Sequence, residues 1–111
     1  MKTICYVESE HQLINAQHAE LINWNTAILA RLGPNFSKER LSKYVNKLAS
    51  KSIRSVKVVN NVGRLCLAYT MLIELLKIKP ARIVIGDARS YLYTLLKIYA
   101  KRRNCELCLV D

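Results

Sequence analysis

The chain has 111 residues, of which 51% are apolar, and its formal net charge is +10. This length is enough for one domain with its own core, and the apolar content excludes a disordered protein. The charge is uneven, since residues 1–30 sum to −2 and residues 31–111 to +12. Such a field favours anionic partners, which include nucleic acid, anionic lipid headgroups and acidic sugars.

A capping signature marks the start of the first predicted helix. An apolar, β-rich run over residues 3–7 predicts a buried strand. Ser9 follows, with Gln12 three residues later, which is the pattern of a capping box. We therefore expect a helix from about residue 10 to 23, in which His18 falls among apolar residues and packs in the core rather than binding a ligand.

The rest of the chain continues to alternate between strands and helices. One helix is apolar almost all round, so it is either deeply covered or covers a partner. This is the helix expected over residues 62–77. The further strands are expected at 26–32, 56–59, 82–85 and 106–110, and the other helices at 37–50 and 90–103.

Strands and helices alternate strictly, and the strands are apolar on both faces. This pattern predicts an α/β fold whose parallel sheet is covered on both faces. Right-handed crossovers favour a five-stranded, doubly wound, Rossmann-like sheet of order 3-2-1-4-5 with four helices, and residues 1–111 form one domain. Ligands of such sheets bind beyond the carboxyl ends of the strands. This rule selects the loops at residues 8–11, 60–61 and 86–90, together with Asp111.

The cofactor motifs expected at this edge are missing from the sequence. The turn after the first strand has no glycine for the approach of a pyrophosphate, and Glu8 and Glu10 stand where phosphates would lie. Cys105 and Cys108 match C-x-x-C in letters only, because positions i and i+3 of a strand face opposite sides. We therefore expect neither a cofactor nor a metal, and buried free thiols are the simpler interpretation of the cysteines.

Several polar groups keep two interpretations. His11 lies in the predicted ligand loop and can serve as an acid or base, or it is an ordinary surface histidine. Asp87 either caps the last helix or holds a sugar hydroxyl. The Lys/Arg face of the helix at 37–50 is either solvated or a patch for nucleic acid or a membrane.

Three segments, taken in order, resemble bacterial sialyltransferase-like glycosyltransferases, among them lipooligosaccharide sialyltransferases and capsule polysaccharide polysialyltransferases. The first is similar to their Ser-x-x-Gln-Leu-x-Asn-Ala segment, the second to their Ile-Gly-Asp-x-Arg-Ser loop, and the third to the strand that leads into their Asp/Glu-Asp/Glu-Gly motif. Glu10-His11 departs from the more usual apolar or proline pair. The segments are Ser9-Glu10-His11-Gln12-Leu13-Ile14-Asn15-Ala16, Ile83-Val84-Ile85-Gly86-Asp87-Ala88-Arg89-Ser90 and Leu107-Cys108-Leu109-Val110-Asp111.

The resemblance implies a two-domain GT-B fold that transfers sialic acid from a CMP-activated donor to a sugar hydroxyl without a metal. It makes Asp111 the first acidic residue of the general-base motif. It also places Gln12, Asn15, Asp87 and Arg89 at first-domain positions near the cleft between the domains. With Ser9, His11 and Gly86 of the predicted ligand loops, these residues are the substrate-binding candidates. Because the rest of the base motif, a His-Pro motif and the second domain do not follow, we expect an acceptor-side N-terminal domain that is inactive alone.

The expected partners are an acceptor glycan and, with a second domain, the CMP-activated sugar. The opening residues are unlike a secretory leader, and no apolar stretch reaches the roughly 20 residues of a membrane span, so we expect a cytoplasmic protein, peripheral on the inner membrane face. The apolar helix at 62–77 predicts a homo-oligomer or poor solubility. The alternative is a small basic module that binds a nucleotide or nucleic acid without catalysis, and nucleic acid is the less favoured partner.

Overall fold

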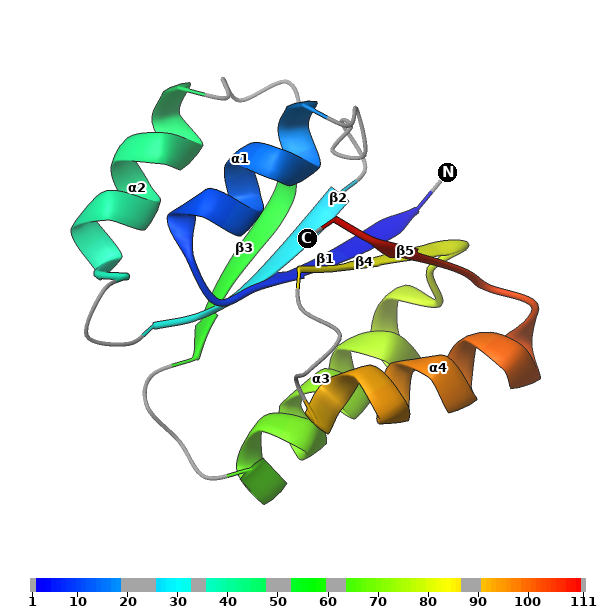
Figure 1. The fold of residues 1–111 in the computed structure, drawn as a ribbon. Coiled ribbons are helices and arrows are strands. Elements are labelled where there is room, and N and C mark those ends of the chain that lie inside the picture. Colours follow the sequence, from blue (N-terminus) through cyan, green and yellow to red (C-terminus); the bar gives the residue numbers. More distant parts are fainter. Residues whose placement is uncertain are drawn as a thin grey trace.

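The computed structural model describes residues 2–18, 26–32, 36–47, 53–59, 64–86 and 91–110. Within these ranges, strands and helices alternate along the chain and the strands pair in parallel, which confirms the predicted α/β class with four helices (Figure 1). The strands are β1 (Thr3–Val7), β2 (Thr26–Arg31), β3 (Ile53–Val59), β4 (Arg82–Ile85) and β5 (Glu106–Leu109), and the helices are α1 (Glu10–His18), α2 (Lys38–Lys47), α3 (Arg64–Ile78) and α4 (Tyr91–Arg103).

β1 lies at the centre of the sheet. The strand order is β3-β2-β1-β4-β5, with Thr3 of β1 opposite Thr26 of β2 on one side and Arg82 of β4 on the other. All five residues of β1 are buried, as expected for a strand that has a neighbour on each side and helices on both faces. Because the strands are parallel, β1, β2 and β4 end at the same edge of the sheet.

Helices cover both faces of the sheet, and each face has its own apolar core (Figure 1). Successive strand residues point to opposite faces, so Ile4 and Tyr6 join one core while Cys5 and Val7 join the other. The first core contains Leu67, Met71 and Leu75 of α3 and Leu92 and Leu96 of α4; the second contains Leu13 and Ala16 of α1 and Leu41 of α2. Burying one such leucine contributes about 1.5–3 kcal/mol.

Only one side of α3 is buried, although its sequence is apolar almost all round. Its buried side packs on the sheet, while Leu65, Tyr69, Leu72 and Leu76 are exposed. Of the two sequence interpretations, the covered helix therefore holds for the buried side of α3, while partner binding by the exposed side stays a prediction.

Other sequence predictions need correction. His18 is exposed, because the buried stripe of α1 is formed by Leu13 and Ala16 on the other side of the helix. Cys5 is buried, but Cys66 is exposed and the two remaining cysteines are half-buried, so the prediction of buried thiols holds for Cys5 alone. β3 begins at Ile53 rather than residue 56, since it pairs with β2 as far back as Thr26 through a register shift.

Within the part of the chain that the structure describes, no helix combines the length and the apolar character needed to cross a bilayer.

Candidate functional site

The carboxyl edge of the sheet brings together three of the predicted site residues. Ser9 follows β1, Gln12 lies in the first turn of α1, and Gly86 follows β4. The Ser9 Oγ accepts a hydrogen bond from the Gln12 backbone N–H at 3.2 Å, which confirms Ser9 as the cap of α1. The Gln12 side chain turns back, and its Oε1 accepts a hydrogen bond from the Glu8 backbone N–H at 2.8 Å.

Gly86 provides the space that the Gln12 side chain fills. Gly86 is buried, and a Cβ at this position would overlap the side-chain amide of Gln12. The glycine is therefore needed for close approach, and its backbone conformation is an ordinary one. Gln12 consequently joins the turn after β1 to the end of β4.

A second polar group lies beside this contact. The buried Tyr6 hydroxyl donates to the Glu8 carboxylate at 2.9 Å, and the positive charge of Arg31, at the end of β2, acts on Tyr6 in the direction that lowers its pKa. Burial, followed by the negative charge of Glu8, raises the pKa of Tyr6 far above its usual value. Tyr6 therefore keeps its proton and holds one oxygen of the Glu8 carboxylate in place. Among the residues that the structure describes, the other oxygen has no hydrogen-bond donor, so it can accept a hydrogen bond from a ligand.

The sequence did not single out the Tyr6–Glu8–Arg31 group as a site. The sequence places Glu8 in the predicted ligand loop at residues 8–11 and as a charge that opposes phosphate binding, but it places Tyr6 in a buried strand and gives Arg31 no role. The available signal was the position of Tyr6 near the end of one central strand and of Arg31 at the end of its neighbour. In a parallel sheet these ends meet, so their polar groups can combine.

The other predicted site residues either take no part in these hydrogen bonds or lie outside the residues that the structure describes. His11 is exposed and Asn15 half-buried on α1, and neither takes part in the hydrogen bonds above. Asp87, Arg89 and Asp111, like the loop at 60–61, lie outside the described residues. Val110 donates its backbone N–H to the Ile85 carbonyl at 3.1 Å, so the end of β5 lies beside the end of β4.

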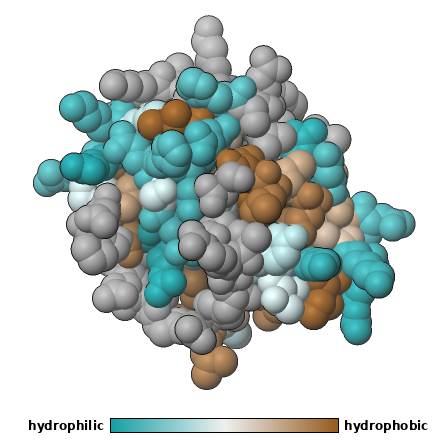
Figure 2. Space-filling view, in the orientation of Figure 1, coloured by the Kyte–Doolittle hydropathy of each residue, from teal (hydrophilic) through white to brown (hydrophobic). Residues whose placement is uncertain are grey.

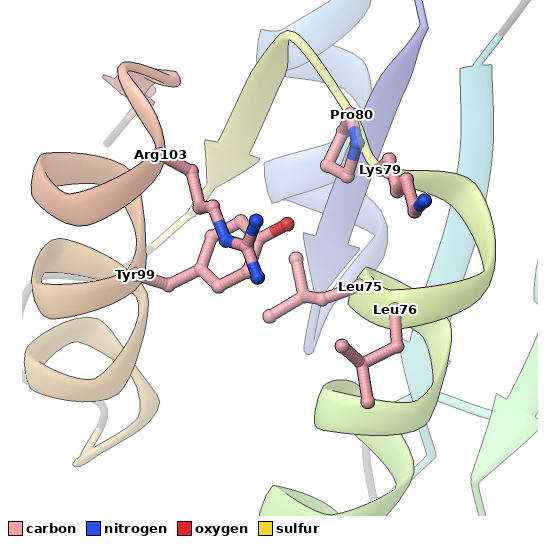
Figure 3. A pocket seen from close by; sticks show the side chains of 6 residues that line it. All are labelled: Leu75, Leu76, Lys79, Pro80, Tyr99 and Arg103. Carbon is pink, nitrogen blue, oxygen red and sulfur yellow. The ribbon is translucent and has the colours of Figure 1, made fainter.

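A small recess opens at the opposite end of the molecule, between the carboxyl ends of α3 and α4. Its volume is about 150 Å³. Leu75, Leu76 and Pro80 give it an apolar wall, while Lys79 and Arg103 bring positive charge and Tyr99 a ring (Figure 3). It is separate from the carboxyl-edge site.

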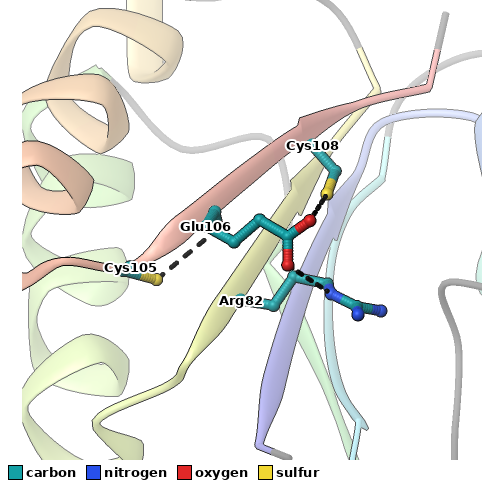
Figure 4. A network of polar contacts seen from close by, with 4 residues as sticks. All are labelled: Arg82, Cys105, Glu106 and Cys108. Atoms are coloured by element: carbon teal, nitrogen blue, oxygen red, sulfur yellow. Dashed lines mark hydrogen bonds and ion pairs between the residues drawn. The ribbon is translucent and has the colours of Figure 1, made fainter.

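The cysteine pair belongs to a polar network on β4 and β5 (Figure 4). Arg82 Nε and the Cys108 thiol both donate to the Glu106 carboxylate, at 3.3 and 3.5 Å. Cys105 packs against the core under α3 and α4 and Cys108 against the core under α1 and α2, so they face opposite sides as predicted. Burial and the Glu106 charge raise the pKa of each thiol, which makes both weaker nucleophiles.

Among the residues that the structure describes, no cluster of three or more His, Cys, Asp or Glu side chains is placed to hold a metal ion. The polar groups at the carboxyl edge are a carboxylate, an amide, hydroxyls and the Arg31 guanidinium, all of which exchange hydrogen bonds with polar ligands.

Comparison with known proteins supplies no relative whose site could be transferred to this chain. The interpretation of the site depends on its own residues and on the resemblance of its sequence motifs. No family model, no curated protein and no solved structure matches the chain.

Proposed function

We propose that the chain forms the acceptor side of a sugar-transfer cleft, as the N-terminal Rossmann-like domain of a sialyltransferase-like glycosyltransferase that acts on bacterial cell-surface glycans. The contact between Gln12 and Gly86 carries the proposal. These residues belong to two separate segments that resemble family motifs, and they meet at the edge where parallel α/β sheets bind ligands.

The polar groups at this edge suit a sugar hydroxyl better than a phosphate. In a dinucleotide site, the backbone N–H groups of the first turn are free to bind pyrophosphate. Here the Glu8 N–H is already bonded to Gln12, and the Glu8 carboxylate repels an anion. A half-buried carboxylate accepts hydrogen bonds from hydroxyl groups, so the edge favours an acceptor glycan over a nucleotide donor.

The chemical step needs groups on both sides of the cleft. By the resemblance, the Asp111 carboxylate removes the acceptor hydroxyl proton, the resulting oxygen attacks the anomeric carbon of sialic acid, and CMP leaves with the bonding electrons. The donor contacts come from a second domain. Because one half-site cannot both orient the acceptor and hold the donor, we expect no CMP release by residues 1–111 alone.

An NMR titration of the ¹⁵N-labelled chain tests the proposal. We expect a galactose-terminated oligosaccharide to shift the amide signals of Glu8, Gln12 and Gly86 saturably, and Gln12→Ala to weaken binding about tenfold, the effect of a lost hydrogen bond to a buried polar group. Lys43→Gln on α2 is the control and leaves the affinity unchanged. Absence of saturable shifts at the carboxyl edge, or rapid CMP release by this chain alone, argues against it.

The alternative is a nucleic-acid-binding module without catalysis. It is favoured by α2, where Lys38, Arg40 and Lys43 are exposed. Titration with duplex DNA at several salt concentrations separates the two functions. Binding that weakens steeply with salt and depends on these α2 cations supports the alternative. Sugar binding at the carboxyl edge without DNA affinity at physiological salt supports the glycosyltransferase domain.

A further inference from the structure

The outer side of α3 carries a continuous line of exposed apolar side chains. Its members recur at intervals of four, three and four residues, which places them on one face of the helix. We call this line the apolar stripe; it consists of Leu65, Tyr69, Leu72 and Leu76, exposed by 88, 67, 40 and 62%. Ile98 of the adjacent α4 is 53% exposed. A continuous exposed apolar surface marks a site of interaction.

Positive charge lies beside the carboxyl-terminal part of the apolar stripe. The sequences of α3 and α4 contain one acidic residue, Glu74, which is half-buried and has an interaction partner. The exposed basic residues of the two helices and of the turn after α3 form a set that we call the cationic rim: Lys77, Lys79, Lys97, Lys101, Arg102 and Arg103. In Figure 2, hydrophilic side chains lie beside apolar ones over α4.

The recess between the helix ends continues the stripe. Leu76 belongs to both, and Lys79 and Arg103 of the cationic rim line the recess (Figure 3). The free carbonyl groups at the end of a helix repel an anion. At each helix end here, one carbonyl accepts a hydrogen bond of 2.9 Å: that of Leu75 from the Lys79 N–H, and that of Ala100 from the Cys105 N–H. Lys79 and Arg103 therefore allow the recess to accept a phosphate group at the end of an apolar surface.

We propose that the outer side of the α3/α4 layer docks on an anionic lipid bilayer. The apolar stripe enters the region between headgroups and acyl chains, and the cationic rim pairs with lipid phosphates. A second copy of the chain would bring the same positive charges against the rim, and nucleic acid offers no apolar phase for the leucines. This inference stands independently of the sugar-transfer function, because it uses the opposite end of the molecule.

Vesicle co-sedimentation tests the charged part of the surface. We expect the chain to bind phosphatidylcholine vesicles that contain phosphatidylglycerol and not vesicles without it, and added salt to weaken binding. The double variant Lys101→Gln with Arg102→Gln should lower the affinity for these vesicles about 25-fold, because each cation lost lowers it about fivefold. Lys38→Gln with Lys43→Gln on α2 lowers the net charge equally and should leave the affinity within about twofold. Equal losses from the two pairs would overturn the proposal.

The apolar part is tested with substitutions of exposed leucines, which leave the core intact. Leu65→Gln with Leu76→Gln should lower vesicle affinity at least about tenfold through lost apolar burial, while Leu109→Gln on β5 should not. Circular dichroism checks that each variant is folded. Failure of the wild-type chain to bind anionic vesicles overturns the proposal. So does a dimer in equilibrium sedimentation that the stripe variants dissociate while vesicle binding persists.

Discussion

Gly86 and Gln12 compete for the same space, so a side chain at one position should be tolerated only when the other is shortened. Gly86→Ala places a Cβ inside the Gln12 side chain and should break its hydrogen bond to the Glu8 N–H. We expect the free energy of unfolding, measured by urea denaturation, to fall by about 1–3 kcal/mol. Acceptor binding in the NMR titration should weaken as well.

The control for this prediction is the double variant that combines Gly86→Ala with Gln12→Ala. Removing the amide makes room for the methyl group that Gly86→Ala adds, so the two substitutions should destabilise less together than the sum of their separate effects. We expect a coupling energy of about 0.5–3 kcal/mol, typical of side chains in contact. Additive effects would show that the two residues do not share one space.

Cys5 should make the stability of the fold depend on alkaline pH. Burial raises its pKa from 9.0 to about 12, so the folded chain keeps the thiol proton where the unfolded chain loses it. Below pH 9 both states are protonated and the effect is absent. Between pH 9.0 and about 12, this group should lower the free energy of unfolding by about 1.4 kcal/mol per pH unit.

The measurement compares urea unfolding of wild type and Cys5→Ala at pH 8 and pH 10. The variant loses packing at both pH values, but it lacks the titrating thiol and should show the shallower decline. Equal slopes for the two proteins would mean that the Cys5 thiol is ionised in the folded chain. Other groups that titrate in this range, Tyr6 among them, contribute equally to both proteins.

The spacing of residues along the chain predicted part of the candidate site. The spacing of Ser9 and Gln12 correctly gave the cap of α1, because capping depends on adjacent backbone groups. The partner of the Gln12 side chain could not be predicted, since it depends on where Gly86 arrives from another part of the chain. The exposure of His18 was missed because residue spacing alone does not say which side of a short helix faces the sheet.

Among the secondary-structure elements, α3 and α4 end in the same way. Lys79 and Asn104, each just after its helix, have φ angles of 51° and 52°, in the left-handed region that favours glycine. A lysine there carries a Cβ that crowds the backbone, whereas asparagine tolerates the conformation better. We expect Lys79→Gly to raise the free energy of unfolding by about 1 kcal/mol and Asn104→Gly to raise it by less, as measured by thermal denaturation.

Two further variants separate the effect of backbone conformation from that of charge. Lys79→Ala removes the same charge without adding a glycine, so it should give no such gain. Ala81→Gly adds a glycine to the neighbouring turn, at a residue without a positive φ, and should lower stability through greater freedom of the unfolded chain. A stabilised Lys79→Ala would assign the effect to charge rather than to backbone conformation.

The order and type of the elements were predictable because their apolar periods are short-range. The residue at which a strand begins and the side of a helix that is buried were not predictable. β3 extends back to Ile53 through less apolar residues, because β2 supplies backbone hydrogen-bonding partners there. α3 is apolar almost all round, and only its packing on the sheet decides that Leu67, Met71 and Leu75 become core while the apolar stripe stays exposed.

In the whole molecule, the net charge of +10 lies within a body of 35 × 30 × 24 Å. At 0.01 M salt the Debye length is about 30 Å, so most of these charges repel one another, while at 0.1 M it is about 10 Å. Folding brings the charges closer together than they are in the unfolded chain. We therefore expect this rise in NaCl concentration to increase the free energy of unfolding by on the order of 1 kcal/mol.

Thermal unfolding at the two salt concentrations checks this expectation. Lys101→Gln with Arg102→Gln removes two neighbouring charges from the cationic rim, so it should stabilise the protein at low salt and reduce the gain from added salt. Glu39→Gln on α2 removes a negative charge and should increase that gain. If all three proteins show the same salt dependence, repulsion within the cationic rim does not limit stability, and the rim's charges are far enough apart to be fully solvated.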